Sequence, residues 1–255
     1  MQSSPDPLAR AKSLYEKSVT PRRTRQMRGL LRESAAETAA FNATTVLCQY
    51  LNRWDNAGPA ELVEAGNAVQ QALFLDPTFF LAHYAQGFLD RTQGRHQDAL
   101  EAFDRTIAYN PEFARVYAQK GEQLVYLGRP DDAIAQVERA MELSPNSKVR
   151  GYFYWVIGRA RFFQGQDAEA VTWLQRSVRA WPSVWYNRLY LLAAHAMLGH
   201  KPAAQRVKKA FDKQFPGYSL ATVTANEGAT PDDNPFVVAG RERFHRALDM
   251  AGFAA

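Results

Sequence analysis

The sequence predicts an all-α protein, a right-handed solenoid of antiparallel helix pairs that ends in a C-terminal capping helix. Three residue series predict this fold, because each recurs about every 34 residues and all share one insertion of three residues. A 34-residue period is typical of stacked helix–turn–helix units. The series are Pro77, Pro111, Pro145, Pro182 and Pro216; Gly94, Gly128, Gly165 and Gly199; and Ala99, Ala133, Ala170 and Ala204.

The composition fits such an array. Hydrophobic residues make up 46% of the 255 residues, enough for a continuous core in which each repeat contacts only its neighbours. The net charge of +5 permits an acidic partner or an anionic surface without requiring one. No apolar run reaches the length of about eighteen residues that would predict a membrane span. The first residues lack the basic and apolar regions of a signal peptide.

Motifs that carry chemistry are missing from the sequence. Cys48 is the single cysteine, so no internal disulfide can form, and a cytoplasmic location is expected. A periplasmic location stays open for a chain whose leader has been removed. Cys48 stands in an apolar helical context and is expected to be buried and inert. The five histidines show no metal-binding spacing, and neither a phosphate-binding loop nor a nucleophile motif is present. We therefore predict no enzyme activity, no cofactor and no metal site.

The chain begins with a basic helical extension, residues 1–34. Pro7–Val19 and Pro21–Arg32 each have the pattern of a helix with proline in its first turn. Five arginines in the Arg22–Arg32 cluster could contact phosphate or an anionic membrane. The alternative is a solvated helix face whose apolar residues dock on the first repeat. We favour this alternative because few aromatic residues accompany the arginines, and nucleic acid is not an expected partner.

Five repeats are expected over residues 35–218. The first, 35–79, is divergent, and its first helix, around Ala35–Trp54, begins with a capping-box pattern. The next two, 80–113 and 114–147, match each other most closely. In each of them a glycine ends the first helix and a proline follows the second, because glycine suits a left-handed cap and proline cannot continue a helix.

The later repeats are less regular. Repeat 148–184 carries the insertion, which is expected to lengthen its first helix by about one turn. Repeat 185–218 is degenerate, since Leu192 replaces the glycine at the close helix contact. Residues 219–236 form an expected loop, and 237–255 a terminal helix that covers the apolar end of the array. Besides the three series above, the positions that define the repeat are Gly87, Phe103, Gly121 and Gly158.

Residues of about 45–216 resemble the tetratricopeptide repeat family. The resemblance implies a non-enzymatic scaffold or adaptor that binds a protein or peptide segment in the concave groove of the array. Four segments also resemble the repeat tails of bacterial adenylate-cyclase-like proteins and winged-helix regulators: Tyr50–Ala65, Ala72–Pro77, Gly151–Ala160 and Arg243–Phe253. That narrower resemblance implies an alternative function, a ligand-responsive regulatory module.

In the repeat family, the first helix of each pair lines the concave face. The resemblance therefore implies a groove that mixes aromatic residues with arginine, the residue types that binding hot spots favour. The alternative is that these side chains only pack in the core. The candidate groove residues are Tyr84, Phe88, Arg91, Arg115, Glu122, Tyr126, Tyr152, Trp155, Arg159, Phe163 and Tyr186.

The expected partner is a segment with apolar and acidic character, and self-association is also open. The family's clamp for a peptide carboxylate is not supported, because its Lys and Asn positions hold Tyr84, Phe88, Arg115 and Gln119.

Overall fold

The computed structural model describes residues 39–51, 58–227 and 234–253. Twelve α-helices make up the described residues, and no strand occurs among them, which confirms the predicted all-α class. The N-terminal extension and its Arg22–Arg32 cluster lie outside the described residues. The helices are α3 (Ala39–Leu51), α4 (Pro59–Leu75), α5 (Phe80–Thr92), α6 (His96–Tyr109), α7 (Ala114–Tyr126), α8 (Pro130–Leu143), α9 (Arg150–Phe163), α10 (Asp167–Ala180), α11 (Trp185–Met197), α12 (Lys201–Gln214), α13 (Leu220–Glu227) and α14 (Pro235–Met250).

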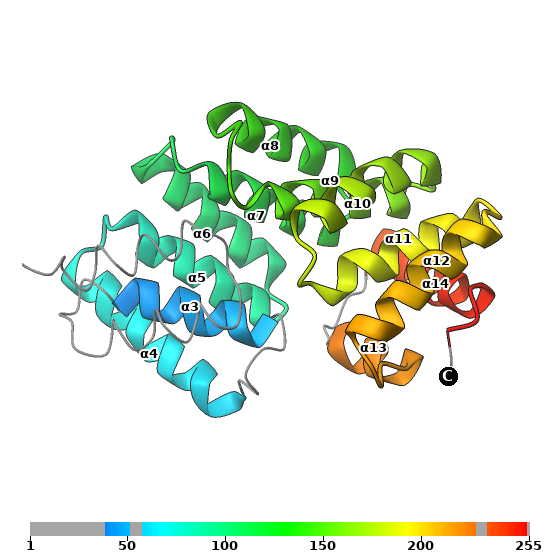
Figure 1. The fold of residues 1–255 in the computed structure, drawn as a ribbon. Coiled ribbons are helices and arrows are strands. Elements are labelled where there is room, and N and C mark those ends of the chain that lie inside the picture. The colour runs from blue at the N-terminus through cyan, green and yellow to red at the C-terminus, as the bar shows by residue number, and fades with distance from the viewer. Residues whose placement is uncertain (1–38, 52–57, 228–233, 254–255) are drawn as a thin grey trace, which may run out of the picture. The chain divides into compact units, whose positions relative to one another are not determined.

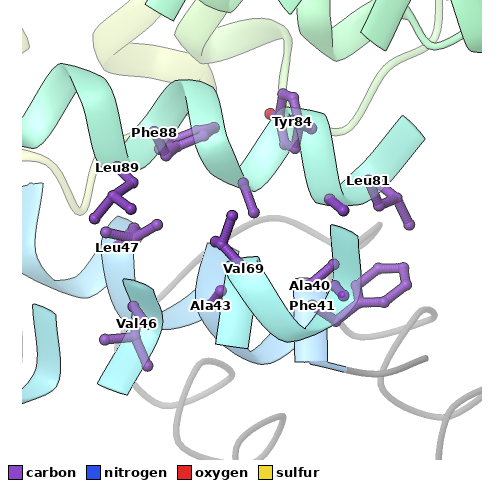
Figure 2. Packing of buried hydrophobic residues seen from close by; sticks show 14 of the residues in the cluster. Ala40, Phe41, Ala43, Val46, Leu47, Val69, Leu81, Tyr84, Phe88 and Leu89 are labelled. Atoms are coloured by element: carbon purple, nitrogen blue, oxygen red, sulfur yellow. The ribbon is translucent and has the colours of Figure 1, made fainter. Parts of the chain in front are cut away.

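The chain divides into two compact units, Met1–Lys120 (unit 1) and Gly121–Ala255 (unit 2), so that α7 contributes to both. In unit 1 the helices pair as α3 with α4 and α5 with α6, and α3 and α4 also pack on α5 (Figure 1). Apolar side chains from α3, α4 and α5 point toward one another in the core, among them Leu47, Val69 and Leu81 (Figure 2). Their burial gives the short helices a stability that helix propensity alone would not supply.

Unit 2 holds the remaining pairs and the C-terminal helix. Helix α10 pairs with α9 and α12 with α11, while α8 packs on α9 and α10 packs on α11. Helix α14 packs against α11 and α9, the first helices of two successive pairs. The core of unit 2 includes four fully buried residues, Phe153, Leu174, Leu192 and Phe244.

The repeat landmarks take the structural roles that the sequence predicts. Gly94, Gly128, Gly165 and Gly199 follow the first helices with φ between 67° and 76°, the left-handed region that glycine enters without steric cost. Gly87 marks the close contact between α5 and α6, since a Cβ there would stand 2.3 Å from the ring of Phe103. Turn and close contact therefore explain why glycine recurs at two positions per repeat.

The insertion differs from the expectation. Helix α9 has 14 residues against 13 in α5 and α11, so it is one residue longer and not one turn. The connection before it has six residues, 144–149, whereas those at 110–113 and 181–184 have four. Two tight turns occupy the longer connection, with Ser147 N–H bonded to Ser144 O (3.0 Å) and Arg150 N–H to Ser147 O (3.3 Å).

The expected loop over 219–236 is wrong in part, because it contains α13. The Ser219 hydroxyl accepts a hydrogen bond from Thr222 N–H (3.2 Å) at the start of this helix, and Val223 is fully buried. A cap and one buried anchor thus outweigh the loop-like composition. The terminal helix begins at Pro235, two residues earlier than expected, because the side chain of Asn234 caps it by accepting from Phe236 N–H (3.0 Å).

No helix in the described ranges combines the length and the apolar character that crossing a bilayer demands.

Candidate partner-binding site

The first helix of each pair carries the candidate groove residues, and we call the surface that these helices build within a unit its first-helix face. In unit 1, Tyr84 and Phe88 of α5 are 2% and 3% exposed. Their rings meet edge-on with centroids 5.0 Å apart, and Tyr84 also meets Phe113 at 4.9 Å. These two candidates therefore lie inside the core and hold α5 in place.

The two arginine candidates of unit 1 keep part of their surface in solvent. Arg91 Nη1 donates a hydrogen bond to Gln119 Oε1 at 3.2 Å. Burial raises the pKa of the Cys48 thiol to about 12, and the positive charges of Arg91 and Arg115 oppose that rise. The charges of both guanidinium groups thus act on the buried thiol of α3, which stays protonated near neutral pH.

In unit 2, a buried ion pair lies on the first-helix face. Arg159 Nη1 of α9 stands 3.6 Å from Glu122 Oε1 of α7, and the two side chains are 5% and 3% exposed. The hydroxyl of Tyr152, which lies about two helical turns before Arg159 on α9, donates to the other carboxylate oxygen of Glu122. The pair is thus both charge-compensated and hydrogen-bonded, the condition under which buried charges are tolerated.

Aromatic rings surround the buried guanidinium. The Cζ atom of Arg159 lies 4.2 Å from the ring centroid of Tyr126, 5.0 Å from that of Phe163 and 5.9 Å from that of Trp155. Burial alone would lower the pKa of Arg159, but Tyr126, Tyr190 and Glu122 outweigh it and hold the pKa above its ordinary value. Arg159 is therefore a permanent cation that fixes the rings around it.

The rings continue across α9 and α11. Trp155 contacts Tyr186 at 4.5 Å, Tyr186 contacts Trp181 at 6.1 Å, and Trp181 contacts Tyr152 at 6.0 Å. We call the whole set the Arg159 cluster. Its members are Glu122, Tyr126, Tyr152, Trp155, Arg159, Phe163, Trp181 and Tyr186.

Exposure within the Arg159 cluster is uneven. Tyr126, Tyr152 and Tyr186 keep part of their side-chain surface in solvent, whereas Trp155 and Phe163 are buried. The structure thus brings together all seven of the groove candidates that fall in unit 2. Only the three tyrosines among them present a usable surface. The cluster can bind apolar groups, and its buried carboxylate, that of Glu122, is committed to Arg159 and Tyr152.

Sequence reasoning missed two parts of this site. Trp181 closes the ring of contacts, although its place before Pro182 suggests only the end of a helix. The second is the reach of α14, which packs on α11 of the last pair and also on α9 of the pair before it. The tail beyond α14 contacts the second helix of the last pair, with Phe253 at 5.6 Å from Phe211 of α12. The signal was the spacing of Phe236, Gly240 and Phe244, which places them along one side of a helix.

No three His, Cys, Asp or Glu residues among those described gather closely enough to hold a metal ion. Fold and site together define a helical-repeat protein that presents a surface of aromatic and charged side chains.

Within this class the repeats are of one particular kind. Residues 84–146 and 118–184 match the sequence profile of the tetratricopeptide repeat. Proteins built from such repeats act in general as scaffolds for protein partners. The narrower resemblance to cyclase-associated and winged-helix repeat tails stays a prediction, because the matching profile describes the repeat in general.

Solved structures share the fold over most of the chain. The pilF protein of Pseudomonas aeruginosa is similar with a TM-score of 0.60 at 17% identity, over 86% of this chain and 90% of that one. PilW, a widely conserved type IV pilus biogenesis factor, gives a TM-score of 0.60 at 18% identity, over 82% and 92%. TTC0263, a thermophilic repeat protein of Thermus thermophilus, gives 0.57 at 16% identity, over 82% and 98%. At these identities the likeness concerns the fold alone.

Proposed function

We propose that the protein is a non-enzymatic adaptor that binds a segment of a partner protein on the first-helix face of unit 2. The observation that carries the proposal is the Arg159 cluster. Three half-exposed tyrosines stand on a buried, charge-compensated base that fixes their positions. Because little side-chain freedom remains to be lost on binding, such a surface is preorganised for a partner.

The chemistry of the face indicates the kind of segment. Tyr126, Tyr152 and Tyr186 keep part of their large aromatic side chains in solvent, and such surfaces favour apolar side chains of a partner. We therefore expect this face to bind an extended or helical segment with apolar character. In unit 1, taken by itself, the part-exposed Arg91 and Arg115 favour acidic side chains.

A capture experiment tests the adaptor function. The wild-type chain and the double variant Tyr152→Ala/Tyr186→Ala are used as bait in a native lysate, and retained proteins are identified by mass spectrometry. Loss of two aromatic contacts should weaken a partner by about 2 kcal/mol or more, roughly thirtyfold in Kd. We expect a protein that the wild-type chain retains and the double variant releases.

Tyr154 provides the matched control. It belongs to the same helix as Tyr152, but its ring faces Trp173 of α10 at 5.7 Å, on the side away from the first-helix face. Tyr154→Ala should therefore retain the partner, while circular dichroism verifies that all variants keep their helicity. Equal retention by all three chains would remove the Arg159 cluster from the binding site.

A further inference from the structure

Helix α14 lies on the first-helix face of unit 2 in the way a bound helix would. Its Phe244 ring stacks on Tyr190 of α11, with centroids 4.0 Å apart and planes 11° apart. Its Phe236 ring meets Phe163 of α9 at 6.0 Å. Between them, a Cβ at Gly240 would stand 2.5 Å from the Phe163 ring, so the α14 backbone approaches α9 as closely as glycine allows.

A polar contact fixes the register of α14 on this face. Arg243 donates from Nη1 to the carbonyl oxygen of Phe162 (3.2 Å) and from Nη2 to Oδ2 of Asp167. Its Cζ also lies 4.5 Å above the Phe162 ring. The Arg243 and Asp167 side chains are 15% and 10% exposed, so the pair is largely removed from solvent. A desolvated, directed pair of this kind gives specificity to an otherwise apolar contact.

The contacts of α14 follow the spacing of helix-in-groove recognition. Phe236, Gly240, Arg243 and Phe244 stand at positions i, i+4, i+7 and i+8, one side of an α-helix. The receiving surface carries an additional acceptor, because Oδ1 of the buried Asp167 accepts no hydrogen bond from the described residues. A ligand arginine that paired with both oxygens of Asp167 would use it, since arginine matches carboxylate geometry with two parallel bonds.

We propose that α14 is an intramolecular ligand of the α9–α11 face, and that a partner helix with the same Phe-x3-Gly-x2-Arg-Phe pattern displaces it. The proposal rests on the adaptor function and deepens it, because it names what occupies the part of the first-helix face that α14 covers. Before displacement the partner contacts only the tyrosines of the Arg159 cluster. Afterwards it also contacts Phe162, Phe163, Tyr190 and Asp167. Because α14 is tethered, it competes with the partner helix at an effective concentration in the millimolar range. Partner binding is therefore suppressed until the partner contacts both the tyrosines of the Arg159 cluster and the surface beneath α14.

A synthetic helix tests this without any natural partner. The probe is a fluorescein-labelled peptide with the sequence of residues 234–253, and its binding to full-length chains is followed by fluorescence anisotropy. Arg243→Glu repels Asp167 and frees the face, whereas Arg246→Ala removes an exposed arginine from the same helix and leaves it bound. We expect the peptide to bind Arg243→Glu about tenfold more tightly, or better, than wild type or Arg246→Ala.

A matched peptide verifies the register. A peptide that carries glutamate at the position of Arg243 should bind Arg243→Glu at least about tenfold more weakly than the native peptide, because Asp167 repels it. Equal affinity of the native peptide for all three chains, or no binding to any, would overturn the proposal. A concentration-dependent dimer of Arg243→Glu that excludes the peptide would assign the face to a second copy's α14 and would also overturn it.

A second measurement uses the wild-type chain, so that the outcome does not depend on how well the variant folds. Uniformly ¹⁵N-labelled protein is exposed to excess peptide, and hydrogen exchange is followed by mass spectrometry, where the label separates its fragments from the peptide. Faster exchange confined to residues 235–250 is the expected result, and unchanged exchange at saturating peptide contradicts displacement. Loss of partner capture without this change would leave the adaptor function standing and remove only the displacement.

Discussion

In a first helix, one position lies where the helix comes closest to its paired second helix. The residue directly after that position differs in its chemistry between the two units. In unit 1 it is Phe88, 3% exposed, which meets Tyr84 and Phe103 edge-on. In unit 2 the same position holds Glu122 in one repeat and Arg159 in the next, and these two form the buried ion pair. One structural position therefore serves as an apolar anchor in one unit and as half of an electrostatic contact in the other.

The difference shows how one position in the repeat can determine which repeats must be neighbours in the folded chain. An apolar ring at this position is satisfied by contacts within its own helix pair, as Phe88 is with Phe103. A charge at the same position needs its counter-charge from the neighbouring repeat. A buried ion pair adds little net stability over well-packed apolar residues, but removing one partner is strongly destabilising. Unit 2 thus depends on a specific neighbour where unit 1 does not.

The largest expected effect comes from breaking the ion pair on one side. Arg159→Leu removes the guanidinium that faces the buried Glu122, whose hydrogen bond from Tyr152 remains, and we expect a loss of about 3–5 kcal/mol in the free energy of unfolding. Urea denaturation followed by far-ultraviolet circular dichroism measures it. The double variant Glu122→Leu/Arg159→Leu should recover most of the loss, because no uncompensated charge remains. A double variant as unstable as the single one would show that the pair itself stabilises the fold.

The next effect compares the close-contact glycines of the two units. A Cβ at Gly87 would stand 2.3 Å from the Phe103 ring, whereas one at Gly158 would stand 2.7 Å from the side chain of Leu174. Overpacking costs about 1–3 kcal/mol, and a rigid ring yields less than a leucine that can change rotamer. In thermal unfolding, the Tm of Gly87→Ala should therefore be lower than that of Gly158→Ala, and both should be lower than the Tm of wild type. The reverse order would mean that the α5–α6 contact adjusts more easily than the α9–α10 contact.

A smaller effect, equal in both units, is expected at the turn glycines. Gly94 and Gly165 have φ of 71° and 76°, where an alanine is strained by about 1 kcal/mol even with open space around it. Gly66 is the matched control, because it lies inside α4 and a Cβ there would make only ordinary contact at 3.7 Å. Gly66→Ala should raise stability by about 0.5–1 kcal/mol. Equal effects of alanine at Gly66 and Gly165, measured as urea midpoints, would contradict the conformational explanation.

The last prediction concerns the reactivity of the Cys48 thiol in unit 1. This thiol is expected to have no effect on the free energy of unfolding near neutral pH. Its pKa of about 12 against an ordinary 9.0 leaves roughly a thousandfold less thiolate at pH 8. Intact-mass spectrometry should show very slow alkylation by iodoacetamide in the folded chain and rapid alkylation in urea. Because the unfolded thiol releases its proton first, stability should fall as pH rises from about 9 toward 12. Equal alkylation rates in both states would mean that the thiol is accessible.

The fold could be predicted from the sequence where one residue type answers one local requirement. Positive φ favours glycine, and most of the close helix contacts also hold it, so Gly87, Gly94 and their equivalents revealed the pairs directly. The insertion was misplaced because its residues form turns that resemble the start of a longer helix. Helix α13 was missed because its buried anchor, Val223, stands among Thr, Asn, Gly and Asp residues that are typical of a loop.

The sequence predicts which candidate side chains share one face of a helix, but not which of them are exposed to solvent. The repeat assigns Trp155, Arg159 and Phe163 to one face of α9, and their contacts confirm that they share it. What covers that face depends on α14, which is more than seventy residues away in the sequence, and a repeat pattern carries no information about it. Tyr84 and Phe88 are buried for a similar reason, since Phe113, beyond the end of α6, packs over Tyr84.

The capping residue of α14 has a consequence for the length of the array. A Cβ at Gly128 would stand 2.9 Å from the side-chain amide of Asn234, so the turn after α7 provides room for the start of the last helix. Tandem repeats usually lengthen and shorten freely by whole units. Here the turn at residue 128 and the helix that begins at residue 235 must meet, so the span between them admits only the pairs it now contains. A duplicated or deleted repeat within it would separate the two, and unit 2 is in this sense a closed assembly of fixed size.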